Sequence, residues 1–436
     1  MLTGDGWLAR LPPLVHPLEP TQLEAIATAA SRHGNGLIEI SKRGNLQLRG
    51  LASPDPAPLA ADLAAAGLVL APGMAVSCDP LADPAAAEPI IAALHRGLEE
   101  SGLGARLAPK VTLVIDLGTP TAPLGLSADL RLALRGGSVH FGLGGTHSGA
   151  RWIGTSPKGD AAARALTILA ALAERGAEAR LARALPDKDG LRDDPAFLAS
   201  IGAVASEPPP AAEQAPAIGP IATLAAPAYG LAFPFGQADA AALARLAAEA
   251  GTCGALGFAP APERALLVTG PQSALAQTVA AATRLGFITT PDDPRRFIAA
   301  CIGSAGCAFG HYPARALARS AVSGLAALLD GSLTLHFSGC AKGCAHPESA
   351  AITLCGIDKG AGLVLDGRAR DEPAGIASPE RLIEGLRRFS GAVGDESAAA
   401  ALRRIGRQGI ARAVIKEASS EHGGEPHLSQ GRQRDL

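Results

Sequence analysis

The sequence of 436 residues has few aromatic side chains, no long apolar run and no excess of charge of one sign. Aromatic residues make up 3% of the chain, and the formal net charge is −2. Neither the whole chain nor any local run of Lys and Arg supplies the cationic field that a nucleic acid or an anionic membrane surface requires. We therefore expect neither partner, and a small molecule is the more natural ligand.

Targeting and membrane-spanning segments are also missing from the pattern. The first twenty residues, "MLTGDGWLARLPPLVHPLEP", lack the charged and apolar regions of a secretory signal. No stretch reaches the roughly 18 apolar residues of a transmembrane helix. The 47% of hydrophobic residues is ample for buried cores. We expect a globular, cytoplasmic protein.

A small structural unit occurs twice. Residues 7–50 predict a strand, a helix over 20–34 and two short strands around a tight turn at Arg43-Gly44. Residues 226–270 repeat this order, and a shift of 220 positions aligns Leu23 with Leu243. The order of elements predicts an internal duplication.

Each small unit is followed by an α/β segment. The first contains helices over 84–101 and 158–177 around several strands, and the second begins with an expected helix at 295–301. Residues 204–222, rich in Pro and Ala, predict a linker, and the polar end of the chain predicts a disordered tail.

Seven cysteines, an odd number, argue against a disulfide framework in a reducing compartment. Four of them form two close pairs, Cys301 and Cys307 in "CIGSAGC" and Cys340 and Cys344 in "CAKGC". Two such pairs can surround one metal centre, and the glycines beside them allow backbone N–H groups to approach inorganic sulfide. A [4Fe-4S] cluster fits this pattern best, whereas zinc and four separate buried thiols remain as alternatives.

The other three cysteines have no paired spacing and predict small core residues; they are Cys78, Cys253 and Cys355.

The cysteine spacing on a duplicated chain resembles the nitrite and sulfite reductase superfamily. Within it, "SGCAKGCAHP" and "PDDPRRFIAACIGSAGCAFG" are most similar to the precorrin-3B synthase family, and "SKRGNLQLRG" and "LAPKVTLVIDLG" are further family-like segments. The resemblance covers residues 1–410. It implies an α+β fold in which two ferredoxin-like half-units pair into one body flanked by two α/β domains.

The implied organisation is as follows: 1–70, first ferredoxin-like half-domain; 71–203, first α/β domain on the tetrapyrrole side; 204–222, linker; 223–288, second half-domain; 289–412, second α/β domain with the [4Fe-4S] cluster; 413–436, disordered tail.

The resemblance also implies roles for single residues. The four paired cysteines match the cluster ligands. Arg43 and Lys110 match catalytic residues that hold a tetrapyrrole, as expected where guanidinium and ammonium groups meet carboxylates. Gln47 and Arg49 alternate along the same strand and are candidates for the same pocket. The ordinary alternative for all four polar residues is a solvated surface.

Two departures from the superfamily pattern bear on the reaction. Met74 and Thr112 stand where sulfite and nitrite reductases carry basic residues that deliver protons to a small anion on sirohaem. The loss of two cationic donors weighs against six-electron anion reduction.

The resemblance implies hydroxylation of precorrin-3A at C20 by O2, with lactone formation, in aerobic cobalamin biosynthesis. It implies an external reductase as electron donor, and leaves open a mononuclear non-haem iron or sirohaem beside the cluster. The alternatives are a sirohaem-dependent sulfite or nitrite reductase and a non-catalytic iron–sulfur electron-transfer protein.

Several other residues could be interpreted as functional, but an ordinary structural role is the simpler interpretation. A single histidine more often packs or hydrogen-bonds than binds metal, which applies to His140, His147, His311 and His346. Lys342 lies between two expected ligands, and we expect its ammonium group to compensate the negative charge of the cluster. The segment "GLGGTHSG" lacks the spacing of a nucleotide-binding loop.

Overall fold

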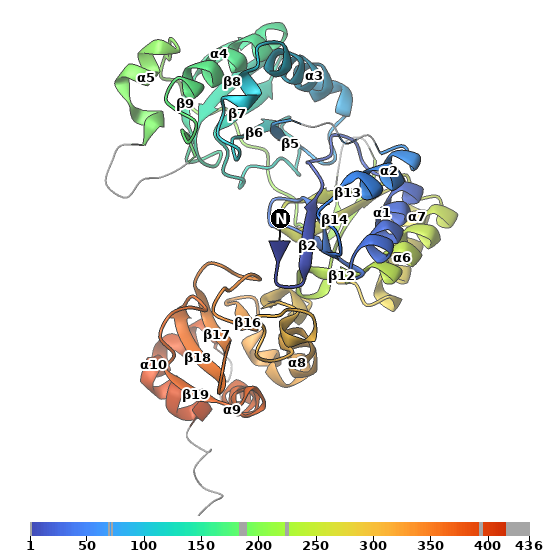
Figure 1. Ribbon diagram of the computed structural model, residues 1–436, viewed down its shortest axis with the longest axis vertical. Helices are drawn as coiled ribbons and strands as arrows, with labels where there is room; N and C mark the ends of the chain where they lie inside the picture. The colour runs from blue at the N-terminus through green and yellow to red at the C-terminus, as the bar shows by residue number, and fades with distance from the viewer. Residues whose placement is uncertain are drawn as a thin grey trace, which may run out of the picture. The chain divides into compact units, whose positions relative to one another are not determined.

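The computed structural model describes residues 2–68, 70, 73–182, 190–222, 226–391 and 396–415. The chain forms two compact units, Met1–Asp293 and Pro294–Leu436, which are described separately. Figure 1 shows the helices and strands of both.

The first unit contains both small repeats. The first repeat comprises β1 (Leu2–Thr3), β2 (Gly6–Arg10), α1 (Pro20–His33), β3 (Leu37–Ile40), β4 (Leu46–Leu51) and α2 (Ala57–Ala65). The second comprises β10 (Gly219–Ile221), β11 (Ala228–Ala232), β12 (Gln237–Asp239), α6 (Ala240–Cys253), β13 (Gly257–Ala261), β14 (Ala265–Thr269) and α7 (Gln272–Arg284). Each helix after the first strand has a defined start: Pro20 opens α1, and the Asp239 carboxylate accepts from two N–H groups of α6.

The duplication is confirmed, and the halves pair as expected. A shift of 220 residues carries α1 onto α6. The pairing between halves is reciprocal: Ala238 of β12 lies opposite Ile38 of β3, and Leu18 exchanges two backbone hydrogen bonds of 2.7 Å with Phe258 of β13. Helices α1, α6 and α7 lie together on one side of these sheets in Figure 1, over a core built from both halves.

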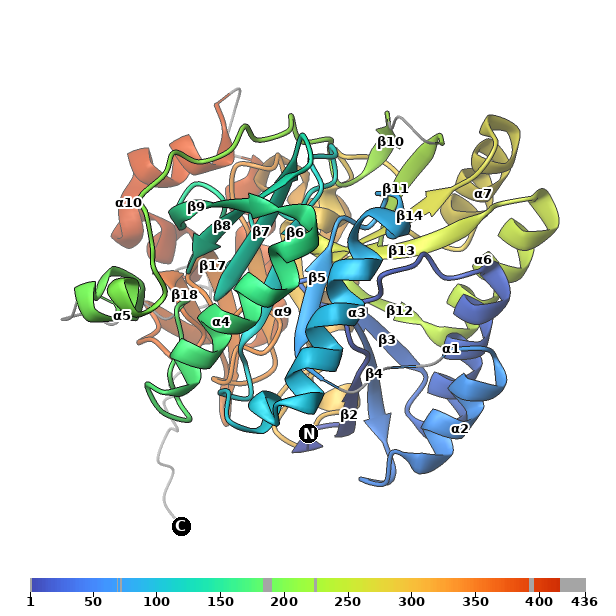
Figure 2. The ribbon, with the colours of Figure 1, turned by 90° about the horizontal axis from the view of Figure 1, so that it is seen from above.

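The α/β part of the first unit is one five-stranded sheet with two covering helices. Its strands are β5 (Ala75–Cys78), β6 (Thr112–Asp116), β7 (Leu130–Arg135), β8 (Ser138–Leu143) and β9 (Arg151–Pro157), in that spatial order. Strands β5 to β7 are parallel, and β8 and β9 are antiparallel. Helices α3 (Pro84–Glu100) and α4 (Ala161–Ala173) cover one face (Figure 2), against Leu113 and Ile115.

Side chains alternate between the two faces along each strand, so every second residue lies on the opposite face of this sheet. That face is polar. It carries Asp116 and Arg131, both fully buried. The loop between β6 and β7 lies over it, with Leu126 packed on Val114. A buried polar face of this kind is unusual for a structural sheet and indicates a site.

The expected linker at 204–222 is wrong in two respects. Its last residues form β10, paired with β11, and the segment before them is bound to the α/β sheet. Backbone hydrogen bonds join Ser206 to Trp152 and Ala215 to Pro120. Proline removes N–H donors but leaves carbonyl acceptors, so this chain can lie along a domain without forming a strand.

The second unit is a five-stranded sheet with helices. Its strands are β15 (Ile298–Ala300), β16 (Leu335–Ser338), β17 (Ala350–Ile357), β18 (Gly360–Gly367) and β19 (Gly375–Ala377), and its helices are α8 (Ala314–Ala321), α9 (Pro379–Gly391) and α10 (Ala398–Ile415). The helix expected at 295–301 is wrong: a single helical turn is followed by β15, parallel to β16. A short apolar run does not distinguish strand from helix, and here sheet pairing decides.

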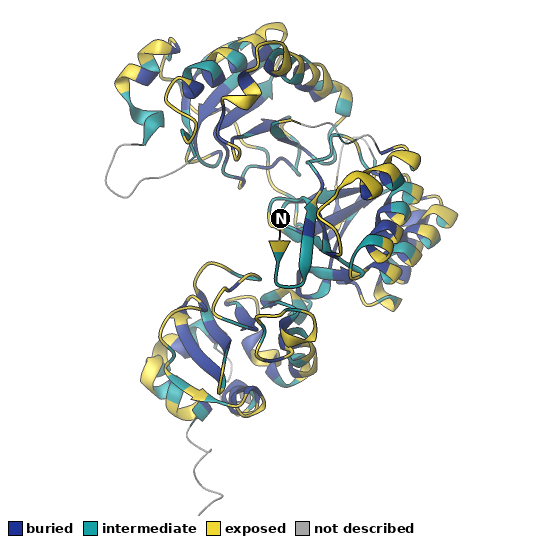
Figure 3. Cartoon of the chain, in the orientation of Figure 1, coloured by how far each residue is buried: buried dark blue, intermediate teal, exposed yellow. Residues whose placement is uncertain are grey.

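The expected tail begins too early, since 413–415 belong to α10, and 416–436 lie outside the described residues. Figure 3 shows that the helices of both units turn exposed faces outward and buried faces toward their sheets. No helix within the described ranges is both long and apolar enough to cross a membrane.

Candidate functional site

The two cysteine pairs come from loops at one edge of the second unit's sheet. Cys301 directly follows β15, and Cys340 follows β16 by two residues. Because these strands are parallel neighbours, their carboxyl ends lie at the same edge. The His311 N–H donates to the Gly339 carbonyl at 2.8 Å and joins the two loops. The sheet thus brings together residues 39 positions apart in sequence.

The surroundings of Cys301 match those of a cluster thiolate. The backbone N–H of Gly339 donates to the Cys301 Sγ at 3.1 Å. A Cβ on Gly339 would lie 2.8 Å from the Gly303 Cα and 3.4 Å from that sulfur, so only glycine allows the two loops to approach. Burial raises the pKa of Cys301, with smaller contributions from Cys340 and Cys307. Backbone N–H groups aimed at sulfur are what stabilise iron–sulfur ligands.

Cys307 and Cys340 are half-buried, and Cys344 is exposed in the loop that ends at His346. In the part of the chain that is described, no three His, Cys, Asp or Glu side chains are grouped to hold a single metal ion. A [4Fe-4S] cube takes one thiolate per iron, so its ligands need not meet at one point. The four cysteines can supply one thiolate for each iron, and the glycines beside them let the backbone come close to the cluster. This set of residues therefore fits such a cluster.

The remaining cysteine of this region is Cys355, within β17 and two residues before its last residue, Ile357. It is buried, and burial raises its pKa to about 11, with smaller contributions from Cys340 and Cys301. The expectation of a core position agrees with this burial.

A cavity of about 500 Å³ lies beside Cys340. Phe309 and Lys342 line it, and the Lys342 Nζ is 3.2 Å from the centre of the Phe309 ring. His311 and Asp358 close another side, with the His311 Nδ1 3.5 Å from the carboxylate. The ammonium of Lys342 therefore lies in a cation–π contact next to an expected ligand.

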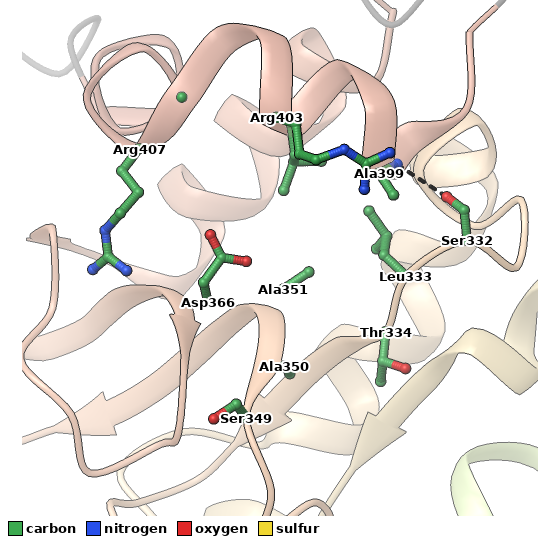
Figure 4. A pocket seen from close by; sticks show the side chains of 12 residues that line it. Ser332, Leu333, Thr334, Ser349, Ala350, Ala351, Asp366, Ala399, Arg403 and Arg407 are labelled. Carbon is green, nitrogen blue, oxygen red and sulfur yellow. Dashed lines mark hydrogen bonds between the residues drawn. The ribbon is translucent and has the colours of Figure 1, made fainter.

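Figure 4 shows a second cavity of this unit, of about 370 Å³, between α10 and the ends of β17 and β18. Arg403, Arg407 and Asp366 point toward it in the figure, and Arg407 donates to the Leu365 carbonyl at 2.5 Å. None of the four paired cysteines lines this cavity, so it is separate from the candidate cluster site.

In the first unit, Arg43 lies in the tight turn between β3 and β4, as the sequence predicts. Its Nη1 donates to the Ser127 carbonyl at 3.0 Å, whereas its Nη2 is buried and has no hydrogen-bond partner among the described residues. Burial lowers the pKa of Arg43, and repulsion from Arg180 and Arg10 adds to this, with Asp129 opposing. A guanidinium in such surroundings favours an added anion.

Three further arginines share this region: Arg10, Arg131 and Arg180, which with Arg43 form the arginine group. Arg131 is 1% exposed and donates to the carbonyls of Pro123 and Leu126, in the same loop as Ser127. Burial lowers its pKa to about 10. The loop between β6 and β7 therefore accepts hydrogen bonds from two arginines, from Arg43 at Ser127 and from Arg131 at Pro123 and Leu126.

The carboxylate that attracts Arg43 is already engaged. Asp129 is fully buried and accepts from Arg180, at 2.8 Å, and from the N–H groups of Thr112, Leu181 and Ala182. Asp129 attracts Arg43, and Asp116 and Asp79 attract Arg131, so the four guanidinium groups outnumber the carboxylates that act on them. Partly buried positive charge of this kind suits a ligand that carries carboxylates.

The other expected pocket residues lie nearby with different partners. Lys110 is exposed, two residues before Thr112. Gln47 is buried between Arg10 and Glu39: its amide oxygen accepts from Arg10 at 2.9 and 3.0 Å in the orientation that satisfies both neighbours. Arg49 is paired with Asp5 at 2.6 Å and with Glu39 at 3.5 Å. Its charge is neutralised within the sheet.

Histidines His140 and His147 lie on and beside the polar face of the sheet. The Nε2–H of His147 donates to the Pro209 carbonyl at 3.1 Å, and its Nδ1 is 3.5 Å from Asp116. Burial lowers the pKa of both rings. His346 donates to the Ser349 carbonyl at 3.2 Å. The contacts of His147 and His346 agree with hydrogen bonding, whereas the buried Nδ1 of His140 has no hydrogen-bond partner among the described residues.

The same face carries a second buried carboxylate, Asp79, which is 3% exposed. It accepts from the N–H groups of Leu117 and Thr119, and one of its oxygens has no partner among the described residues. Burial, followed by repulsion from Asp116, raises the pKa of Asp79 to about 7. This carboxyl group therefore holds its proton up to near-neutral pH.

The raised pKa of Asp79 predicts a pH-dependent stability. The folded chain keeps a proton that the unfolded chain loses above its ordinary pKa of 3.8, so the unfolding free energy falls as pH rises from there to about 7. The loss is about 4 kcal/mol if the shift acts alone. Asp79→Asn, which mimics the neutral acid, should abolish this part of the slope and be the more stable chain at pH 8. Denaturant midpoints between pH 5 and 8 measure it; parallel curves for both chains would contradict the assignment.

Comparisons with known proteins bear on identity. Residues 3–66 match the model of the nitrite/sulfite reductase ferredoxin-like half domain. A curated precorrin-3B synthase from Sinorhizobium sp is 37% identical over 426 residues, which cover 93% of this chain and 90% of that protein. The chain belongs to the precorrin-3B synthase family. The family resemblance expected from the sequence is confirmed.

The fold is also found among solved structures. The NirA protein of Mycobacterium tuberculosis matches with a TM-score of 0.67 over 93% of this chain and 84% of its own, at 18% identity. At that identity the likeness concerns the fold alone. It confirms the expected nitrite/sulfite reductase-like architecture for this member of the precorrin-3B synthase family.

Sequence reasoning missed Arg10, Arg131 and Arg180. Arg131 was visible only as a charged residue inside the apolar run "LRLAL", a pattern that marks a buried charge and hence a site. Arg10 of β2 pairs with Gln47 of the neighbouring strand β4, and Arg180 contacts Asp129, 51 residues earlier in the sequence. No pattern in the sequence near Arg10 or Arg180 indicates these contacts.

Proposed function

We propose that this chain is a precorrin-3B synthase, which hydroxylates precorrin-3A at C20 with O2 and forms a lactone with an acetate side chain. The observation that carries the proposal is the 37% identity to the curated enzyme over nearly the full length of both chains. The surplus positive charge of the arginine group supports a substrate with many carboxylates. The enzyme is then an oxidoreductase of aerobic cobalamin biosynthesis, working in the cytoplasm.

Hydroxylation places one oxygen atom of O2 in the product and releases the other as water, with two electrons and two protons supplied from outside. Cys301, Cys307, Cys340 and Cys344 are the residues that would hold a [4Fe-4S] cluster. When bound, such a cluster supplies single electrons. The electrons would come from an external reductase, since no nucleotide-binding spacing occurs in the sequence.

The chain's own residues would bind and orient the macrocycle. Arg43, whose buried Nη2 has no partner in the described chain, would donate to one substrate carboxylate, and Lys110, two residues before β6, would donate to another. Arg131 would hold the β6–β7 loop in place through its two carbonyl contacts. Fixed donors of this kind orient a flexible anion without reorganisation during the reaction.

Turnover of precorrin-3A under ¹⁸O2 tests the proposal. We expect one labelled oxygen atom in the product and no product without O2. The new hydroxyl oxygen should not come from water. Mass spectrometry of the product measures all three. Oxygen-independent conversion would sink the proposal.

A sirohaem-dependent reductase is the second candidate, favoured by the match of residues 3–66 to the nitrite/sulfite reductase half domain. Met74 and Thr112 lie at neighbouring strand starts, with Ala75 opposite Thr112, and neither side chain provides a cation there. The visible spectrum separates the two. An intense Soret band with sulfite or nitrite reduction would favour the reductase, and a weaker iron–sulfur spectrum the synthase.

A further inference from the structure

The turn that carries Arg43 has a counterpart in the second half of the body. Under the shift of 220 residues, Arg43 corresponds to Glu263 and Gly44 to Arg264. The counterpart, turn 261–265, joins β13 to β14 as the Arg43 turn joins β3 to β4. Duplication thus supplied two equivalent turns, of which only the first has a cation at the Arg43 position; the second has Glu263 there.

The two turns are in direct contact. The N–H of Glu263 donates to the Lys42 carbonyl at 3.2 Å. On the other side, a Cβ on Gly44 would lie 2.7 Å from the Ala261 carbonyl carbon and 2.9 Å from the Pro262 nitrogen. Backbone therefore packs on backbone at this point, and the position admits only glycine.

Turn 261–265 has an uncommon conformation. Glu263 and Arg264 have φ of 61° and 63°, in the left-handed region that side chains disfavour. Phe235, with φ of 57°, precedes Gly236, over which the Arg264 side chain lies. Three of the four non-glycine residues with positive φ in the described ranges thus belong to this corner. Such conformations persist only where the surroundings hold them, and they concentrate at functional sites.

We infer that turn 261–265 is a positioning element for Arg43: it fixes the Arg43 turn so that the guanidinium can bind a carboxylate of a macrocyclic substrate. The inference rests on the proposed function. Arg43 reaches the Ser127 carbonyl from a short turn, in which the Asn45 N–H donates to the Ser41 Oγ and the Asn45 side chain to the Leu11 carbonyl. The contact from the second half constrains this turn from outside. Half of the duplicated body binds, and the other half holds the binding residue in place.

Gly44→Ala in the full-length chain tests this, with Gly36→Ala as the matched control. Both glycines have left-handed φ, 82° and 73°, so alanine strains the backbone at both. Only at Gly44 does the new methyl group meet the second half, because no atom of the described residues lies within 4 Å of a Cβ on Gly36. Fluorescence quenching of uroporphyrin, a carboxylate-rich macrocycle, measures binding. We expect Gly44→Ala to weaken it by roughly tenfold or more, and Gly36→Ala to leave it within about twofold.

A double-mutant cycle separates positioning from general destabilisation. In an Arg43→Met background, Gly44→Ala should cause little further loss, because no guanidinium is left to place. An equal effect of Gly44→Ala in both backgrounds, or equal losses from both glycine substitutions, would overturn the inference. Uroporphyrin binding by Arg43→Met as tight as that of the wild type would also overturn it. The proposed function is tested separately, by turnover of precorrin-3A.

If Gly44→Ala does not fold, amide hydrogen exchange in the unmodified chain decides. The Glu263 N–H should exchange as slowly as the amides of β14, and more slowly with uroporphyrin bound. Exchange at the rate of an open turn, unchanged by the ligand, would overturn the positioning role.

Discussion

Cys340→Ser should yield a protein without turnover and without the absorbance of the proposed iron–sulfur cluster. A serine hydroxyl is far less acidic than a thiol and binds iron weakly, so loss of one of four ligands leaves the cluster open to solvent and to loss of iron. Iron and acid-labile sulfide per chain, together with the visible spectrum of anaerobically purified protein, measure the change. We expect both contents to fall to a small fraction of the wild-type values.

Cys355→Ser is the matched control for this result. Cys355 lies in the neighbouring strand β17, where it pairs in register with Ser338, the last residue of β16, and it is buried. Its substitution makes the same chemical change in the same corner of the sheet. The cluster should stay, with some loss of thermal stability because a hydroxyl is buried. Retained colour in Cys340→Ser, or loss of colour in Cys355→Ser alone, would show that the ligand set is wrong.

The duplicated body could be predicted because its signals are local. Each repeat has its own helix start, apolar periodicity and turn, and the order of elements survives even where residues differ. What the sequence could not give is the reciprocal pairing of Leu18 with Phe258 and of Ala238 with Ile38, since strand partners are chosen by tertiary contacts.

The errors have equally physical causes. Residues 295–301 have too few positions for periodicity to distinguish strand from helix, and β16 supplies the hydrogen bonds that settle it. The Pro-rich segment 204–222 lacks periodicity, yet its carbonyls accept from His147 and Arg135 on the sheet. Composition reports the absence of a regular element, but not the absence of contacts.

The candidate pocket shows the limit of transferring residues by motif. Arg43 and Arg49 lie in the same motif and carry the same charge, but Arg49 is paired with Asp5 and Glu39 while Arg43 has a buried Nη2 without a partner in the described chain. The difference depends on Asp5, which is 44 residues away from Arg49. Charge in a motif becomes a binding charge only where the fold leaves it unneutralised.

Arg43→Met is therefore expected to weaken substrate binding strongly, and Arg49→Met to leave it nearly unchanged. A charged hydrogen bond to a carboxylate contributes roughly 1.5–3 kcal/mol, which corresponds to a loss of about 10- to 150-fold in affinity. Methionine keeps most of the side-chain length without donors, so packing changes little. Arg43→Lys should fall between the two because it keeps the charge but loses the planar pair of donors.

Steady-state kinetics with precorrin-3A, with KM and kcat determined at two salt concentrations, distinguish the roles of these two arginines. For Arg43→Met we expect a raised KM that responds less to salt than the wild type, because one of the screened attractions is gone. For Arg49→Met we expect an unchanged KM and a lower melting temperature, since Asp5 and Glu39 lose their ion pairs with this guanidinium. The reverse pattern would mean that the ion pairs of Arg49 open on substrate binding, and that the substrate carboxylates lie over β4 rather than at the Arg43 turn.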